Sequence, residues 1–140
     1  MKALFLAGGM GTRLKPLTDH LPKPMVPVMG VPLLERTIRE LKRCGVNEIV
    51  LSTCYRSDCI EQHFGTAKAE GLKIHCVCEE KPLGTGGAIK NCQKYFNGTF
   101  LVFNSDILSN IDLKALVKLH REKHADVTIA AAKMPLLMLP

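Results

Sequence analysis

The sequence predicts an α/β protein with a mostly parallel sheet and helices on both faces. Five short apolar stretches have the composition of buried strands, and four helical stretches separate them, so the two kinds of element alternate along the chain. The length of 140 residues and the hydrophobic share of 46% are those of one globular unit that buries a sizeable core. Together these observations indicate a three-layer sandwich of helices, sheet and helices.

In the first half of the chain, strands are expected at Lys2–Leu6 and Glu48–Thr53. A long loop rich in glycine and proline follows the first of these strands. Apolar residues at helical spacing then predict a helix over about 32–44, and Gly45 provides its end. A second, shorter helix with a serine at its start is expected over 57–64, directly after the second strand.

In the second half, apolar runs predict strands at Leu72–Cys78, Thr99–Asn104 and Asp126–Ala132. Helices are expected from the glycine-rich turn after the third strand to about Tyr95, and over 112–123. In parallel sheets of this kind, ligands bind outside the carboxyl ends of the strands. The loops that follow the strands are therefore where a functional site is expected.

Composition excludes several classes of function. The net charge of +6 is spread along the chain, there is no tryptophan, and only 5% of residues are aromatic, so a nucleic-acid partner is not expected. No apolar run approaches the roughly 18 residues of a membrane span. The apolar run after Lys2 is too short for a secretory signal, so we expect a cytoplasmic protein whose six cysteines are free thiols.

The loop after the first strand, LAGGMGTRLKPLTDHLPKP, has the features of a phosphate-binding loop. Gly8, Gly9 and Gly11 allow backbone N–H groups to approach an anion closely. The loop lacks the G-K-[ST] ending of a Walker A motif, and Leu14 stands where the dinucleotide fingerprint has its third glycine. The glycines thus predict an anion site of neither common type.

Two basic residues in the same loop strengthen this prediction. Arg13 offers a planar fork for phosphate oxygens, and Lys23 offers a compact point charge. Pro22 and Pro24 restrict the backbone on either side of Lys23, which lowers the entropic cost of placing its ammonium group. The alternative is a flexible surface loop with incidental charges.

The third and fourth strands end in acidic residues at the same expected edge. Glu79 and Glu80 could form a metal site, a general base or a hydrogen-bond acceptor for a nucleobase, and we favour the acceptor. A glycine-rich turn that begins at Gly84 follows them. Asp106 comes directly after the fourth strand and is the candidate Mg²⁺ ligand, because Mg²⁺ in proteins takes one or two carboxylates together with phosphate and water. Its alternative role is a turn or helix cap.

The stretch LAGGMGTRLKPLTDHLPKPMVPV resembles the signature of the sugar-phosphate nucleotidylyltransferases, which join a nucleoside triphosphate to a sugar 1-phosphate. EEKPLGTGGA and NSDIL follow in the order and at about the spacing of that family, so the similarity covers nearly everything from Met1 to Ala132. It implies a Rossmann-like sandwich, Mg²⁺ as cofactor, and in-line attack of a sugar-phosphate oxygen on the α-phosphorus with loss of pyrophosphate.

The resemblance also implies roles for individual residues. The implied catalytic residues are Arg13, Lys23 and Asp106, with Asp106 as the metal ligand. The implied nucleotide-binding residues are Leu6, Ala7, Gly8, Gly9, Gly11, Thr12, Arg13, Glu79, Gly84 and Thr85.

The base and the sugar are less closely determined. Guanine presents two adjacent donors that one carboxylate can accept, so Glu79 favours GTP, and EEKPLGTGG looks most like the branch that acts on mannose 1-phosphate. The alternative is a thymidylyl- or adenylyltransferase acting on glucose 1-phosphate, because Glu79 and Glu80 are not distinguished by sequence.

Members of this family usually continue beyond the fifth strand, with segments that bind the sugar and supply a second metal-binding aspartate. We therefore expect residues 1–132 to be the N-terminal part of a nucleotidyltransferase domain, and residues 133–140 to be an atypical apolar tail that marks a possible truncation. A nucleotide-binding module without turnover is the alternative of another class, and exposed apolar surface makes a homo-oligomer possible.

Overall fold

The structure is a computed structural model that describes residues 1–9, 11–66 and 71–132, without the side chains of residues 65 and 66. Its contacts divide the chain into two compact units, Met1–Leu108 and Ser109–Pro140. The predicted tail, residues 133–140, lies outside the described residues.

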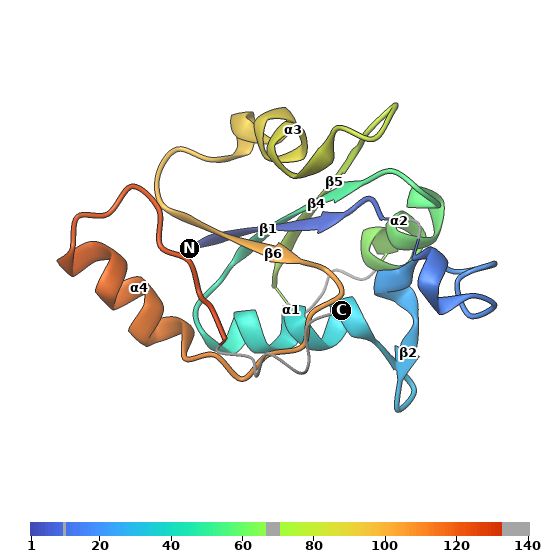
Figure 1. Cartoon of the computed structure of the whole chain (residues 1–140), viewed down its shortest axis with the longest axis horizontal. Helices are drawn as coiled ribbons and strands as arrows, with labels where there is room; N and C mark the ends of the chain where they lie inside the picture. The colour runs from blue at the N-terminus through green and yellow to red at the C-terminus, as the bar shows by residue number, and fades with distance from the viewer. Residues whose placement is uncertain (10, 67–70, 133–140) are drawn as a thin grey trace. The chain divides into compact units, whose positions relative to one another are not determined.

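The first unit is built on a four-stranded sheet with the order β5-β4-β1-β6, shown in Figure 1. The strands are β1 (Lys2–Ala7), β4 (Glu48–Thr53), β5 (Lys73–Cys78) and β6 (Phe100–Asn104). Every neighbouring pair is parallel, so all four carboxyl ends lie at one edge. The direction in which successive strands are added reverses between β1 and β6, and ligands of open α/β sheets bind at such a reversal.

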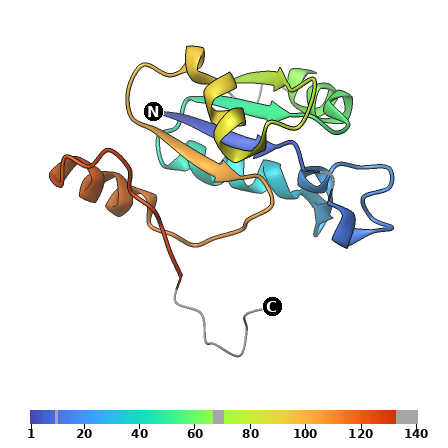
Figure 2. The same cartoon turned by 45° about the horizontal axis from the view of Figure 1, so that its top comes forward.

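Helices cover both faces of this sheet. Figures 1 and 2 show α3 (Gly84–Asn91) on one face and α1 (Leu33–Arg43) on the other. The helix α2 (Ser57–Thr66) packs against β5, and His63 on α2 contacts Glu35 on α1 with 2.9 Å between Nε2 and Oε2. The predicted Rossmann-like three-layer sandwich is confirmed. None of the described helices is long and apolar enough to cross a membrane.

The core lies on the two central strands, β1 and β4. Leu4, Phe5, Val50 and Leu51 have no accessible surface, because both faces of the sheet are covered. Burying each such side chain contributes about 1.5–3 kcal/mol relative to leaving it in water. These residues hold the strand ends, and the loops that leave them, in fixed positions.

The long predicted loop contains short elements that sequence periodicity does not reveal. Two are 3₁₀ turns, η1 (Thr12–Leu14) and η2 (Lys23–Met25). A hairpin of two-residue strands, β2 (Pro27–Val28) and β3 (Val31–Pro32), follows. A third 3₁₀ turn, η3 (Gln93–Tyr95), lies after α3. Such elements are too short to show a period of 2 or 3.6 residues.

The second unit confirms one prediction and corrects another. The helix α4 (Leu113–Glu122) begins at Asp112, whose carboxylate accepts a hydrogen bond of 3.0 Å from the backbone N–H of Ala115. The predicted fifth strand, 126–132, is wrong, because these residues form no strand. Strand propensity is expressed only where a ladder partner and a buried face are available, and here Val127 and Ile129 are 74% and 82% exposed.

Candidate active site

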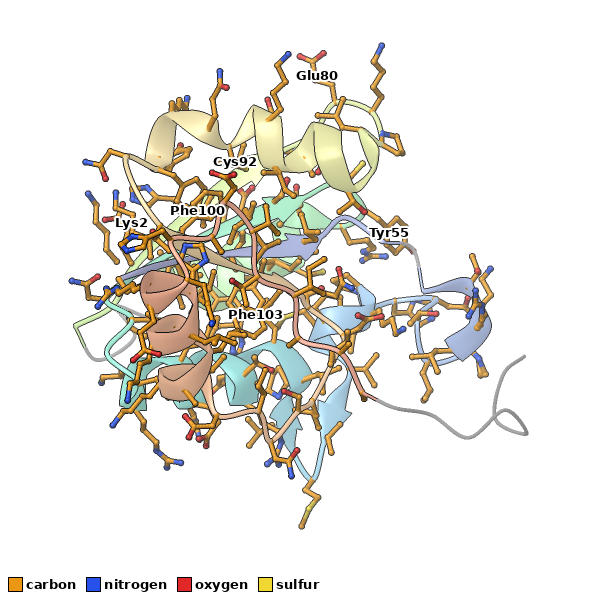
Figure 3. All side chains as sticks on the ribbon, turned by 60° about the vertical axis from the view of Figure 1, so that its left-hand side comes forward. Lys2, Tyr55, Glu80, Cys92, Phe100 and Phe103 are labelled. Carbon is orange, nitrogen blue, oxygen red and sulfur yellow. The ribbon has the colours of Figure 1, made fainter. Side chains whose placement is uncertain are left out.

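The candidate residues lie at the carboxyl ends of the strands in the first unit. Figure 3 shows Lys2, at the start of β1, and Tyr55, just after β4, at opposite ends of the sheet. The loops that leave β1, β4, β5 and β6 all begin at the Tyr55 end. This arrangement follows from the parallel pairing and brings together segments that are distant in sequence.

Gly8 passes close to the ends of two other strands. A Cβ atom at this position would lie 3.3 Å from Cys54 Cβ and 3.7 Å from Glu79 Oε1. A side chain at Gly8 would therefore contact the Glu79 carboxylate, and glycine leaves this space free. At Gly9, by contrast, a Cβ would meet no described heavy atom within 4 Å, so this part of the loop is open.

Gly11 is held in a left-handed conformation against two neighbours. Its φ is +64°, and a Cβ there would lie 2.9 Å from Lys23 Cβ and 3.0 Å from Thr18 Cγ2. The Thr18 hydroxyl donates a hydrogen bond of 2.9 Å to the carbonyl of Gly11. Only glycine fits this conformation and this space. The Lys23 side chain therefore lies directly against the backbone of Gly11.

Lys23 lies between two buried prolines. Pro22 and Pro24 are buried, while the Lys23 side chain keeps 34% of its surface accessible. Its Nζ lies 2.5 Å from Oδ2 of Asp106, whose side chain is 33% exposed. The structure thus brings the candidate phosphate-binding cation and the candidate metal ligand into direct contact, at an accessible position.

Asp106 is positioned by the residue before it. Ser105 donates from its backbone N–H, at 3.2 Å, and from its hydroxyl, at 2.8 Å, to the carbonyl of Leu6. These bonds join the end of β6 to the end of β1, so Asp106 emerges beside the glycine loop. A carboxylate at this place, a third exposed and beside the glycine loop, fits Mg²⁺ that shares its coordination with nucleotide phosphates. No group of three or more metal-ligating side chains occurs in the described part of the chain.

The two glutamates after β5 have different surroundings. Glu79 is 7% exposed, and its carboxylate accepts from the Ser52 hydroxyl at 2.7 Å and from the Leu83 backbone N–H at 3.0 Å. Glu80 is exposed, and Figure 3 shows it on the outside of the turn before α3. Only Glu79 therefore belongs to the candidate site.

The remaining candidate residues are less closely joined to this group. Arg13 is exposed and makes no hydrogen bond or ion pair with any residue that the structure describes. Thr12, Gly84 and Thr85 are also exposed, whereas Ala7 is buried and Leu6 is half-buried. Gly84 begins α3 with a φ of +68°. The structure places these residues on the same loops but shows no contact between Arg13 and Asp106.

Two residues at the end of β4, Ser52 within the strand and Cys54 directly after it, lie beside the candidate residues and were missed from sequence. Ser52 contacts Glu79, and Cys54 lies against Gly8. Burial raises the pKa of the Cys54 thiol, and the negative charge of Glu79 raises it further. The signal was available, because this apolar strand ends at the same edge of the sheet as the strands that carry the other candidate residues.

Comparison with known proteins identifies the family of the chain. A profile of the nucleotidyl transferase family matches residues 2–136. Mannose-1-phosphate guanylyltransferase of Mycobacterium tuberculosis is 44% identical over 133 residues, which cover 94% of this chain and 37% of that protein. D-glycero-alpha-D-manno-heptose 1-phosphate guanylyltransferase of Aneurinibacillus thermoaerophilus is 37% identical over 135 residues, covering 96% of this chain and 58% of that protein.

A solved structure shares the fold as well. HddC from Yersinia pseudotuberculosis, complexed with GMP-PN, matches with a TM-score of 0.77 and 39% identity, over 85% of this chain and 53% of that chain. This chain therefore spans between 37% and 58% of the length of these relatives. Since the family profile covers nearly all of its residues, the chain belongs to the nucleotidyl transferase family.

Proposed function

We propose that the protein transfers a guanylyl group from GTP to a sugar 1-phosphate, mannose 1-phosphate, with release of pyrophosphate. The observation that carries this proposal is the contact between Lys23 and Asp106 beside Gly11, at the point where strand order reverses. A cation for phosphate and a carboxylate for a metal ion are the groups that nucleotidyl transfer requires.

The reaction needs positioning and neutralisation of charge. An oxygen of the sugar phosphate attacks the α-phosphorus of the nucleotide, the bond to the bridging oxygen breaks, and pyrophosphate leaves with the electron pair. In this proposal the amides of Gly8, Gly9 and Gly11 bind phosphate oxygens, and the Arg13 guanidinium turns inward to bind them as a fork. Lys23 neutralises charge that develops on the phosphates.

Asp106 would hold Mg²⁺ against the phosphates. The ion would supply charge neutralisation at the phosphate oxygens. The accessible carboxylate, next to the glycine loop, supports this role. Lys23 is paired with that carboxylate in the structure. On nucleotide binding, its ammonium group would exchange Asp106 for a phosphate oxygen as its partner.

The guanine assignment depends on Glu79. Its carboxylate can accept N1–H and the 2-amino group of guanine together, whereas uracil and thymine offer one ring donor. The names of both guanylyltransferase relatives favour the same base.

The protein is proposed to work in the cytoplasm on small phosphorylated substrates. All six of its cysteines are free, which suits a reducing compartment. Its scattered positive charges suit small anions better than nucleic acid.

The test is pyrophosphate release by the purified 140-residue chain with Mg²⁺. GTP, dTTP, ATP and UTP are each combined with mannose 1-phosphate and with glucose 1-phosphate, and nucleotide binding is measured by calorimetry. Release with GTP and mannose 1-phosphate is the expected result, and release with another pair would reassign base or sugar. Binding without release would identify a nucleotide-binding module, the alternative of another class. Absence of both would refute the proposal.

A pair of lysine variants tests the site itself. Lys23→Ala should weaken GTP binding by about 10- to 100-fold, the value of one charge-assisted hydrogen bond, while leaving the fold intact. Lys15→Ala is the matched control, because Lys15 lies in the same loop, is 63% exposed and pairs only with Asp19 among described residues. Equal effects of the two variants would show that the loop's charge matters but the position of Lys23 does not.

A further inference from the structure

We propose that Ser52 is a positioning residue that orients the Glu79 carboxylate and thereby sets the preference for guanine over bases without a 2-amino group. Because it takes Glu79 as the acceptor of the base, this role rests on the proposed function. Ser52 itself has no accessible surface, so it acts on the nucleotide only through Glu79.

The Glu79 carboxylate is fixed by one donor on each oxygen. The Ser52 hydroxyl, from β4, donates to Oε1 at 2.7 Å, and the backbone N–H of Leu83 donates to Oε2 at 3.0 Å. The backbone N–H of Glu79 also donates to the carbonyl of Thr53 at 2.7 Å. These three bonds hold both the main chain and the side chain of Glu79, so the plane of its carboxylate is set before any ligand binds.

The carboxylate nevertheless keeps capacity for a ligand. Each carboxylate oxygen can accept two hydrogen bonds, and the two internal donors use one site on each. Glu79 retains 7% of its surface, and Oε1 lies 3.7 Å from the position that a Cβ of Gly8 would occupy. The free sites are thus one on each oxygen, which suits two parallel donors such as N1–H and the 2-amino group of guanine.

Of the two donors to the Glu79 carboxylate, the Ser52 hydroxyl belongs to a side chain and the Leu83 N–H belongs to the backbone. Without the Ser52 hydroxyl, Oε1 would lose its internal donor in a buried position, and the carboxylate would turn or shift to find another partner. The Leu83 bond alone fixes one oxygen and leaves rotation about it. A ligand would then bear the entropic cost of orienting the carboxylate, which removes the advantage of its second hydrogen bond.

A purely structural role of Ser52 makes a different prediction. If the Ser52–Glu79 bond only joins β4 to the turn before α3, its loss lowers stability and weakens all nucleotides equally. The ratio of affinities for GTP and inosine triphosphate separates the two roles, because inosine keeps N1–H and lacks only the 2-amino group. A ratio is insensitive to the fraction of protein that is folded.

The experiment measures the dissociation constants of GTP and inosine triphosphate by calorimetry, with Mg²⁺, for the full chain and four variants. The wild-type chain should prefer GTP by about tenfold or more, the value of one hydrogen bond to a charged acceptor. Ser52→Ala should reduce this preference to about threefold or less. Ser52→Cys, which keeps a weak donor of similar size, should be intermediate and serves if Ser52→Ala does not fold.

Two further variants complete the design. Thr53→Val is the matched control, because Thr53 is the next residue of β4, is equally buried, and its hydroxyl donates to the Val77 carbonyl at 3.5 Å. The variant keeps the backbone carbonyl of residue 53 that accepts from Glu79. It should keep the wild-type ratio of the affinities for GTP and inosine triphosphate. Glu79→Gln should bind the two nucleotides with equal affinity.

The outcomes distinguish an error in the role of Ser52 from an error in the assignment of guanine to Glu79. A normal ratio in Ser52→Ala and Ser52→Cys, with a lost ratio in Glu79→Gln, would overturn the role of Ser52 and leave the base assignment standing. A wild-type chain without preference, or a normal ratio in Glu79→Gln, would overturn the base assignment and with it the role of Ser52. Loss of the ratio in Thr53→Val as well would also refute the specific role, because any disturbance of β4 would then suffice.

Discussion

Replacing Gly11 by alanine tests whether the glycine loop is built around Lys23. The left-handed conformation, with φ at +64°, costs a residue with a Cβ about 1–2 kcal/mol. The new Cβ would also lie 2.9 Å from Lys23 Cβ and 3.0 Å from Thr18 Cγ2. Thr18 is 1% exposed and its hydroxyl is bonded to Gly11, so it cannot turn away freely. Shifting the neighbouring atoms to make room for the Cβ costs about 1–3 kcal/mol.

The expected loss of stability for Gly11→Ala is therefore about 2–5 kcal/mol, the sum of the conformational and packing costs. A domain of ordinary stability, about 5–15 kcal/mol, would still fold. Urea unfolding followed by far-UV circular dichroism measures the difference in free energy of unfolding. GTP binding, measured on the folded variant, should also weaken, because Lys23 must move.

Gly9→Ala is the control for this prediction. A Cβ at Gly9 meets no described heavy atom within 4 Å, and its φ lies outside the left-handed region, so its stability should stay within about 1 kcal/mol of wild type. If Gly11→Ala unfolds within about 0.5 kcal/mol of wild type, or no earlier than Gly9→Ala, the described packing of the loop is wrong.

Three further predictions concern positions outside the phosphate loop. Gly86→Ala should stabilise α3 by about 0.5–1 kcal/mol, whereas Gly87→Ala should destabilise the protein because its Cβ would lie 2.8 Å from Leu83 Cβ; urea unfolding of the pair decides this. Burial alone raises the pKa of the Glu48 carboxyl, but bonds from Lys2 and His75 and nearby positive charge outweigh it, so the pKa is lowered from 4.5. Such a carboxyl stabilises the fold above its unfolded pKa and loses this effect as pH falls through the folded pKa. Glu48→Gln should thus cost stability at pH 7 and progressively less below about pH 4.5, and a constant difference across thermal unfolding at several pH values would contradict this. Finally, burial raises the pKa of the Cys76 thiol to about 11, so iodoacetamide at pH 8 should label exposed Cys78 well before Cys76, as peptide mass spectrometry would show.

The strands that carry the site could be predicted from sequence because they are buried on both faces. Their near-continuous apolar runs identify β1, β4, β5 and β6, and parallel pairing then follows from the alternation with helices. The same argument places Lys23 and Asp106 on loops that leave neighbouring strands, whereas the direct contact of their side chains depends on the course of the long loop after β1. The stretch 126–132 has a similar apolar run, but such a run predicts burial only where the fold supplies a partner.

The finer features of the site depend on tertiary contacts that no local pattern encodes. Glu79 and Glu80 are adjacent and identical in type, so only the exact end of β5 decides which of them is buried. The role of Ser52 requires knowing that β4 lies beside β5. A serine at the end of a strand is otherwise unremarkable, and its meaning comes from its neighbour on the next strand.

The ion pair between Lys23 and Asp106 has a consequence for how the ligands of the site depend on each other. If the site binds nucleotide and Mg²⁺ as proposed, a nucleotide without metal would draw Lys23 away from Asp106 and leave an unpaired carboxylate beside its own phosphates. A metal ion without nucleotide would displace the Lys23 ammonium from the same carboxylate. The metal–nucleotide complex would give both side chains a partner at once, so its binding free energy should exceed the sum of the separate ones, and by linkage each ligand should tighten the other by the same factor.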